Sequence, residues 1–273
     1  MPMRNGHGAF PLAKGSGAIS SFAQADGFLM IDALSDHLAE GSRSKVVLFD
    51  RDLRVPDLVI MGSHCVGLEV VVDAVAELGF AVRIVPIGSM GGLAAAKRGE
   101  CDIAPIHLMD PKTELYNESF VGPDQTLVKG WRRMQGLIFR PDDARFEGCG
   151  TAAEAIAAAL SDATCLMVNR NQGSGTRIMI DRLIGRLRPK GYWNQPKSHN
   201  AVAAAVAQHR ADWGVAIEPV ARAYGVKFLS IGEEHYDFAI PQSRRQNRSV
   251  QAFVDVLGRQ DVLRGLREVG VLP

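Results

Sequence analysis

The chain has 273 residues, with 31 lysine and arginine residues against 30 aspartate and glutamate residues and a formal net charge of +1. This balance argues against a general nucleic-acid or membrane binder, because a nearly neutral protein has no net positive potential to attract a polyanion or an anionic membrane. With 47% hydrophobic and 22% charged residues the composition is typical of a globular protein, and the length predicts about two domains.

The first fifty residues are predicted to form a small β element. Glycines interrupt short apolar segments, and Gly27–Ile31 and Lys45–Phe49 are predicted strands on either side of a polar connection. The segment is too short to bury much apolar surface alone. We therefore expect it to belong to a larger domain or to pack on its neighbour.

The compartment is predicted from what the sequence lacks. The four cysteines, at positions 65, 101, 149 and 165, show no CxxC or zinc-finger spacing, which favours reduced thiols. The first residues have no apolar signal-peptide core, and no uncharged apolar run approaches the roughly 20 residues of a membrane span. We expect a cytoplasmic protein with no membrane partner.

After a charged linker, Asp50–Pro56, predicted strands and helices alternate. The predicted strands are Leu58–Met61, Val82–Ile87, Asp102–His107, Cys165–Val168, Trp213–Ile217, Val226–Ile231 and Tyr236–Ile240. The predicted helices are Val66–Leu78, Leu93–Arg98, Ala152–Leu160, Gly175–Leu187, Ala201–Gln208, Val220–Tyr224, Val250–Leu257 and Val262–Val269. Two successive strand–helix units favour a parallel sheet, so the predicted fold class is α/β.

Three turns share one design, in which an apolar strand ends, a glycine and a small hydroxyl residue follow, and a helix begins. They are Gly62-Ser63, Gly88-Ser89 with Gly91-Gly92, and Gly173-Ser174-Gly175-Thr176. Each places helix N-terminal N–H groups and a hydroxyl where open α/β folds bind ligands, which predicts an anion site. For any single turn the favoured alternative is a helix N-cap, worth about 0.5–2 kcal/mol, but three together favour function.

Several other chemistries are disfavoured. The glycine-rich segment Asn169–Arg177 has no lysine where a P-loop requires one, and no GxSxG motif surrounds the serines of the three turns. Cys65 at a helix start is an alternative nucleophile with His107, but a small packing residue is favoured. A metal site of His64, His107 and His199 is less favoured than solvated or hydrogen-bonded histidines.

Four segments carry a family resemblance: Gly62-Ser63-His64-Cys65, Gly88–Ala104, Asn169–Arg177 and Ala211–Ala216. Together they resemble the periplasmic-binding-protein-like domain of cytoplasmic molybdenum-cofactor and molybdate-response proteins. The resemblance implies a two-lobed type II α/β fold. Lobe 1 would comprise residues 57–130 plus 237–273 and lobe 2 residues 131–236, with hinges near Leu127–Gly136 and Ile231–Tyr236.

The N-terminal piece carries a separate resemblance. Pro11–Gly27, Leu38–Ser42 and Val46–Phe49 look like the end of the C-terminal β domain of molybdopterin molybdenumtransferase. The resemblance implies that residues 1–50 are a partial domain of that type and that this chain is the C-terminal portion of a longer fusion protein. The chain alone is then not expected to be catalytic, and its partners are the attached molybdenum-cofactor biosynthesis domains.

Carried over to this sequence, the resemblance assigns oxyanion contact to Ser63, Ser89, Ser174 and Thr176. The predicted ligand-binding set is completed by His64, Gly175 and Arg177, and Arg170 is a further source of charge. The implied ligand is molybdate or tungstate, held between the lobes, with no covalently bound cofactor and no metal ion ligated by the protein.

Two alternatives stay open. His64 and Cys65 depart from the small residues of transporter-type proteins, which suits an organic ligand such as the pterin. The chain would then form part of a molybdopterin molybdenumtransferase enzyme. The other alternative is a sensor domain for a small organic ligand, which is weakened because no helix-turn-helix precedes residue 57.

Overall fold

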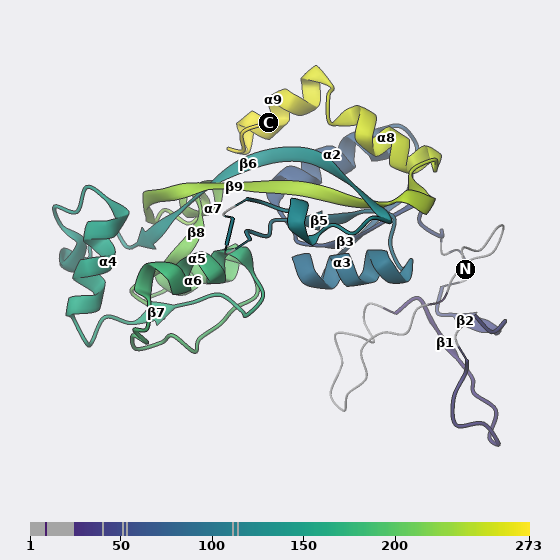
Figure 1. The fold of residues 1–273 in the computed structure, drawn as a ribbon, viewed down its shortest axis with the longest axis horizontal. Coiled ribbons are helices and arrows are strands. Elements are labelled where there is room, and N and C mark those ends of the chain that lie inside the picture. The colour runs from purple at the N-terminus through teal and green to yellow at the C-terminus, as the bar shows by residue number, and fades with distance from the viewer. Residues whose placement is uncertain are drawn as a thin grey trace. The chain divides into compact units, whose positions relative to one another are not determined.

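The computed structural model describes residue 9 and residues 25–39, 41–50, 52, 54–110, 112–113 and 115–273. The chain divides into two units, Met1–Asp57 and Leu58–Pro273 (Figure 1). In the first unit β1 (Gly27–Leu29) pairs antiparallel with β2 (Val46–Leu48), which confirms the small β element. The predicted resemblance of Pro11–Gly27 falls mostly outside the described residues.

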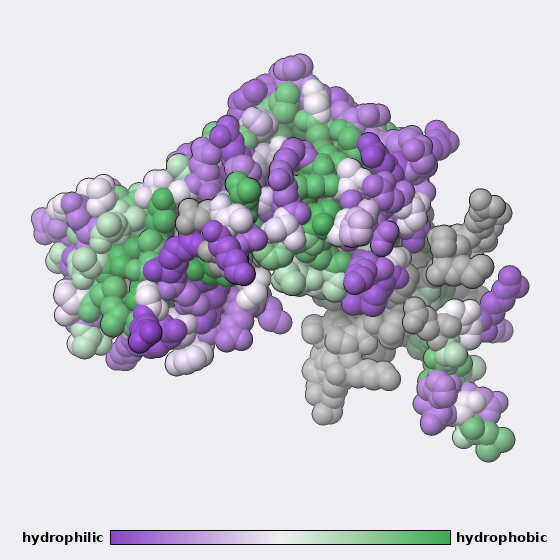
Figure 2. All heavy atoms as spheres, in the orientation of Figure 1, coloured by the Kyte–Doolittle hydropathy of each residue, from purple (hydrophilic) through white to green (hydrophobic). Residues whose placement is uncertain are grey.

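The apolar side chains of the β1–β2 pair are exposed. Phe28 and Leu48 are 46% and 41% exposed, and the rings of Phe28 and Phe49 lie 5.8 Å apart. Figure 2 shows hydrophobic side chains at the surface of the described part of this unit. Within the described part of this unit, no residue belongs to a buried hydrophobic cluster. A two-stranded hairpin of this kind is at best marginally stable alone.

The second unit is a mixed α/β structure. Its strands are β3 (Leu58–Gly62), β4 (Val82–Pro86), β5 (Ala104–Ile106), β6 (Gln125–Phe139), β7 (Met167–Val168), β8 (Trp213–Ile217) and β9 (Lys227–Pro241). Its α-helices are α2 (Val66–Glu77), α3 (Ser89–Arg98), α4 (Ala152–Ser161), α5 (Gly175–Ile184), α6 (His199–Ala207), α7 (Glu218–Ala223), α8 (Arg248–Val256) and α9 (Gln260–Glu268). Short 3-10 turns are η1 (Glu118–Phe120), η2 (Ala144–Phe146) and η3 (Gln242–Arg244). None of the helices in the described ranges is long and apolar enough to span a membrane.

Two long strands organise this unit. β6 and β9 have 15 residues each and pair antiparallel along most of their length, in a sheet of order β5-β9-β6-β8-β7. β3 and β4 form a separate parallel pair, joined to the segment before β5 by the bridge of Ile60 and Ile103. Figure 1 shows β6 and β9 running between one group of helices, α2, α3, α8 and α9, and another, α4 to α7.

Separate hydrophobic cores lie at the two ends of these strands. Trp131 of β6 and Phe238 of β9 join a core with β3, α2, α8 and α9. Leu137 of β6 joins a second core with α4, α5 and Trp213 of β8, and Ile138 joins a third with α6 and α7. Because each end buries its own apolar residues, the unit has two lobes that β6 and β9 connect.

Several predicted boundaries differ from the structure by one to three residues, and two predictions are wrong by more. Helix α3 begins at Ser89 rather than Leu93, because Gly91 and Gly92 form its first turn instead of extending the preceding loop. The predicted strands Val226–Ile231 and Tyr236–Ile240 are one strand, since pairing with β6 continues through the polar residues between them, with a register shift near Gly136.

Gly92→Ala is expected to lower the free energy of unfolding by about 1–3 kcal/mol. A Cβ at Gly92 would lie 2.5 Å from the carbonyl oxygen of Met61 and 2.7 Å from the Cα of Gly62, and these are backbone atoms that cannot turn away. The matched control is Gly91→Ala, whose Cβ would meet only the side chain of Ile87, at 3.3 Å. Thermal unfolding should show a lower Tm for the Gly92 variant than for the Gly91 variant, and equal values would contradict this packing.

Candidate functional site

A buried polar cluster occupies the middle of β6 and β9. Successive side chains of a strand point to opposite faces, so Trp131, Arg133 and Gln135 of β6 share one face. Glu234 lies opposite Arg133 in the strand pairing, and therefore on the same face. Arg133 and Glu234 are both 0% exposed, and Gln135 is 1% exposed. Charged side chains are almost never buried to this extent unless they are paired.

Glu234 holds this cluster together. Its carboxylate forms an ion pair with the guanidinium of Arg133 and accepts a hydrogen bond from Nε2 of Gln135. The guanidinium carbon of Arg133 lies 4.7 Å from the ring centroid of Tyr236. Burial opposes ionisation of Glu234, but Arg133, the hydrogen bond with His107 and the charge of Arg170 together hold its pKa below the ordinary value. Glu234 is therefore a buried carboxylate that stays charged.

His107, which follows β5, reaches the same carboxylate. Its Nδ1 lies 3.1 Å from Oε2 of Glu234, and a carboxylate can only accept, so Nδ1 carries the hydrogen. Its backbone N–H donates to Oγ of Ser89 at 3.1 Å. Burial lowers the pKa of His107 below its ordinary value of 6.5, although Glu234 opposes the shift. The imidazole is thus neutral at neutral pH.

The other lobe contributes Arg170, after β7, and His199, the first residue of α6. Nη1 of Arg170 lies 3.0 Å from Nε2 of His199. Arginine can only donate, so Nε2 accepts and Nδ1 of His199 carries the hydrogen. Burial lowers the pKa of Arg170 to about 10, which leaves it charged, and burial with Arg170 lowers that of His199 far below 6.5. The rings of His107 and His199 are 6.4 Å apart, so the two lobes meet here.

Several donors of this cluster are unused. Among the described residues, Nε of Arg170, Nδ1 of His199, Oγ1 of Thr176 and Nε and Nη1 of Arg133 are buried without a hydrogen-bond partner. Buried polar groups are nearly always paired, so each exception requires an explanation. The cluster also has two guanidinium groups against one carboxylate. Unused donors together with an excess of positive charge suit an anion.

The native state should lose stability as the pH falls below about 6.5. The pKa values of His107 and His199 are both lowered from 6.5, so the unfolded chain takes up protons at a higher pH than the native state does. The free energy of unfolding should then decrease by up to about 1.4 kcal/mol per pH unit for each histidine. Denaturant unfolding at about pH 7.5 and about pH 5.5 measures this loss. His199→Gln should reduce the slope, and an unchanged slope would contradict the neutral burial of His199.

Three of the residues predicted from the sequence lie against His107 or Tyr236. Ser63 accepts a hydrogen bond from the Tyr236 hydroxyl through its carbonyl oxygen, and Ser89 binds the backbone of His107. A Cβ at Gly175 would lie 2.5 Å from the carbonyl oxygen of His107, so the N-terminus of α5 contacts the end of β5 directly. The structure therefore brings all three glycine–hydroxyl turns together, the third through Gly175 at the start of α5.

The other predicted residues have different surroundings. Ser174 is the N-cap of α5, since its Oγ accepts from the backbone of Arg177 at 3.2 Å, while Thr176 has the unused hydroxyl described above. Arg177 donates to Asp181 at 2.9 Å and to the Tyr192 hydroxyl. The side chain of His64 is 37% exposed, and its Nε2 lies 3.1 Å from Oε1 of Glu69 on α2. Their assignment as ligand contacts stays a prediction.

The ligand site predicted from the sequence did not include Arg133, Gln135 or Glu234. The available signal was alternation in Leu127–Phe139, where Arg133 and Gln135 share a face with the apolar Trp131 and Leu137. A charged residue in such a position is either solvated or part of a site. Only the packing of both lobes over this face shows that it is buried.

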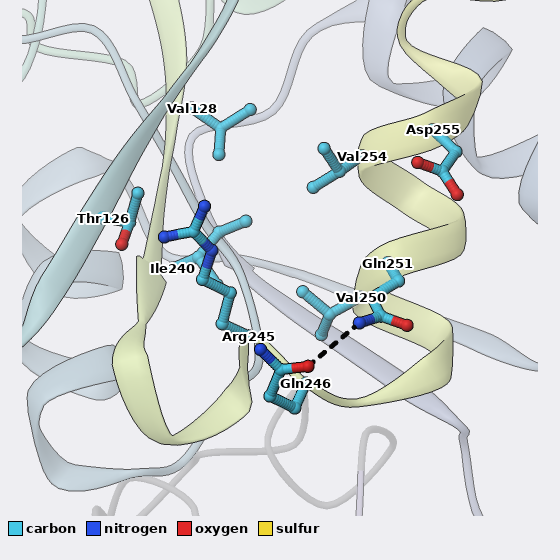
Figure 3. Close-up of a pocket in the computed structure, with 9 residues that line it drawn as sticks. All are labelled: Thr126, Val128, Ile240, Arg245, Gln246, Val250, Gln251, Val254 and Asp255. Carbon is cyan, nitrogen blue, oxygen red and sulfur yellow. Dashed lines mark hydrogen bonds between the residues drawn. The ribbon is translucent and has the colours of Figure 1, made fainter.

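Other features of the second unit do not offer the same chemistry. A pocket of about 270 Å³ lies between α8 and the β6–β9 face, with Arg245 pointing into it and Gln246 bonded to Gln251 (Figure 3). It shares no residue with the buried cluster. In the described ranges no three histidine, cysteine, aspartate or glutamate side chains gather as metal ligands, and all four cysteines are free.

The comparisons with known proteins agree with this architecture. A family model described as the PBP superfamily domain matches residues 73–258, and one described as the MoeA C-terminal region (domain IV) matches residues 4–49. The uncharacterized protein YvgK of Bacillus subtilis is 27% identical over 185 residues, which are 64% of this chain. The chain spans 57% of the length of that relative.

Solved structures share the fold at low sequence identity. A putative phosphate ABC transporter substrate-binding protein with bound phosphate, from Clostridium perfringens, has a TM-score of 0.58 at 15% identity and covers 79% of this chain and 98% of its own. The tungstate ABC transporter structure from Geobacter sulfurreducens has a TM-score of 0.57 at 16% identity and covers 77% and 97%. These similarities show the two-lobed fold.

Proposed function

This chain belongs to the PBP superfamily, and from that premise we propose that residues 58–273 bind an oxyanion, molybdate or tungstate, between the two lobes. The observation that carries the proposal is the set of buried donors without a partner, from Arg133, Arg170, Thr176 and His199. A tetrahedral oxyanion offers only acceptors, which such donors can bind with short, charge-assisted hydrogen bonds. The first N–H groups of α5, which have no acceptor within the helix, add to the set.

Binding requires the lobes to part and to close. The donors belong to both lobes and to the connecting strands, and they are buried, so an anion reaches them only when the lobes separate. We propose lobe limits of 57–130 plus 237–273 and 131–236, with bending near Leu127–Gly136 and Ile231–Tyr236. Closure then couples the level of the anion to the activity of attached molybdenum-cofactor biosynthesis domains in the cytoplasm. The match of residues 4–49 to the MoeA C-terminal region supports that association.

One observation favours a second candidate ligand. Oε1 of Gln135 is a buried acceptor without a hydrogen-bond partner in the described part of the chain. A fully deprotonated oxyanion has no hydrogen to offer it, whereas a pterin has N–H donors. The second candidate is therefore a pterin-type ligand, with the chain acting as part of a molybdenum-transferring enzyme.

Thermal unfolding with a set of ligands tests these proposals. The chain is heated with molybdate, tungstate, sulfate, phosphate or a molybdopterin-type ligand. A ligand at about 100 times its Kd stabilises the native state by about 2.7 kcal/mol, which raises the Tm by about 5–10 °C. We expect molybdate and tungstate to raise the Tm. If only the pterin-type ligand does so, the second candidate replaces the first, and if none does, both are wrong.

A further inference from the structure

We propose that the site takes a doubly charged oxyanion, and that His107 supplies a second positive charge by taking up a proton when the anion enters. This inference rests on the proposed function, and it defines both the charge class of the ligand and the effect of pH on its binding.

The closed cluster has one net positive charge. Arg133 and Arg170 are cations, Glu234 is an anion, and His107 and His199 are neutral. A dianion buried here would leave a net negative charge away from water. Such a charge is costly in a medium of low dielectric constant, and buried groups change their protonation rather than bear that cost. One added proton would balance the charge of the dianion.

The hydrogen bonds of the two histidines differ in a way that selects His107. Nε2 of His199 accepts from Arg170 at 3.0 Å, so a proton added there would face a guanidinium donor. Nδ1 of His107 instead donates to Glu234 at 3.1 Å, and a carboxylate stabilises the imidazolium. The added proton therefore goes from solvent to Nε2 of His107, and it returns to solvent when the anion leaves.

The surroundings of His107 explain why the proton is absent before the anion binds. Burial is the main cause of the lowered pKa of His107, and Arg133 from β6 and Arg170 from beyond β7 add to it by repelling a positive imidazole. An anion bound by the donors of these two arginines would offset that repulsion. The groups that face His107 are Glu234 and Tyr236 of β9, Arg133 of β6, Arg170, His199 of α6 and Gly175 of α5.

Comparing two anions of similar size but different charge tests whether proton uptake depends on the charge of the ligand. Tungstate and perrhenate are both tetrahedral, but tungstate carries two negative charges and perrhenate one. Calorimetric titration of the full chain, in buffers of different ionisation enthalpy, counts the protons taken up on binding. We expect uptake of about one proton with tungstate and none with perrhenate. The affinity for tungstate should weaken by up to about tenfold per pH unit as the pH rises above neutral, and that for perrhenate should not change.

His107→Gln provides a second test, because glutamine can still donate to Glu234 but cannot titrate. This variant should lose the proton uptake and should bind tungstate less tightly relative to perrhenate. His37→Gln, at an exposed histidine beside Asp36 in the first unit, is the matched control and should keep the uptake. Tungstate binding without proton uptake, or uptake that survives in His107→Gln, overturns this inference and leaves the proposed function intact. If no oxyanion binds at all, the proposed function fails and this inference fails with it.

Discussion

Glu234→Gln is expected to lower the free energy of unfolding by about 3–5 kcal/mol and the Tm by about 6–20 °C. Arg133 is fully buried, and the substitution removes the carboxylate that neutralises it. The cost comes from leaving a charge unpaired away from water, which exceeds the net stability that the intact pair contributes. Glutamine keeps one acceptor oxygen, so it cannot face Arg133 with an acceptor and also accept from His107 and Gln135, as the carboxylate does. Denaturant unfolding at neutral pH measures the change.

The neighbouring residue provides the matched control. Glu233 pairs with Arg132 at 3.0 Å, but the two side chains are 38% and 53% exposed. Exposed ion pairs contribute about 0–1 kcal/mol, so Glu233→Gln should change the stability by less than about 1 kcal/mol. Similar losses in the two variants would show that burial does not determine the cost, and would contradict the charge cluster as described.

Arg170→Met is expected to weaken tungstate binding by about 10- to 150-fold, because each hydrogen bond from a charged donor contributes about 1.5–3 kcal/mol. Arg170 is 5% exposed, and its Nε is buried without a partner among the residues that the structure describes. Methionine keeps much of the apolar stem while removing the donors and the charge. Calorimetric titration of the folded variant, checked by its thermal unfolding, measures the affinity.

Arg132→Met is the control for charge alone. Arg132 is exposed, so the variant removes the same formal charge without removing a buried donor. Its affinity for tungstate should stay within about threefold of the wild type at physiological salt, because exposed charges are screened. An equal loss of affinity in the two arginine variants would point to general attraction rather than a defined site.

Two hydroxyls of the α5 turn separate helix capping from ligand binding. Ser174 caps the helix, and Thr176 has a buried hydroxyl with no partner in the described part of the chain. Ser174→Ala should therefore cost about 0.5–2 kcal/mol of stability and have the smaller effect on affinity. Thr176→Val should lower affinity without loss of stability. If Ser174→Ala lowers the affinity more than Thr176→Val does, the ligand contact is Ser174, as the sequence pattern predicted, rather than Thr176.

The sequence predicted the local elements because their patterns are local. Apolar runs such as Leu58–Met61 and Trp213–Ile217 are strands within one residue of the prediction, and Ala152–Leu160 lies within α4. The predicted start of α3 was wrong. A glycine at position 92 is required inside the helix by its close contact with Met61, which lies 31 positions earlier in the chain and is not visible in the local pattern. The continuous strand β9 was also missed, since its polar middle residues pair with β6 rather than turn.

By itself the sequence determined the α/β class and the turns that place hydroxyls beside helix starts, because these features depend on periodicity and on residues that are neighbours in the chain. The two-lobed family was indicated by the resemblance of four segments to a known family. Only the tertiary structure decided which charges are buried together. Arg133 and Glu234 are 101 positions apart and become partners through the pairing of β6 with β9, while His107, Arg170 and His199 join them because the lobes meet there. A polar side chain is either a solvated surface group or a buried donor in a site, depending on which residues pack over it. Here those residues come from distant parts of the chain.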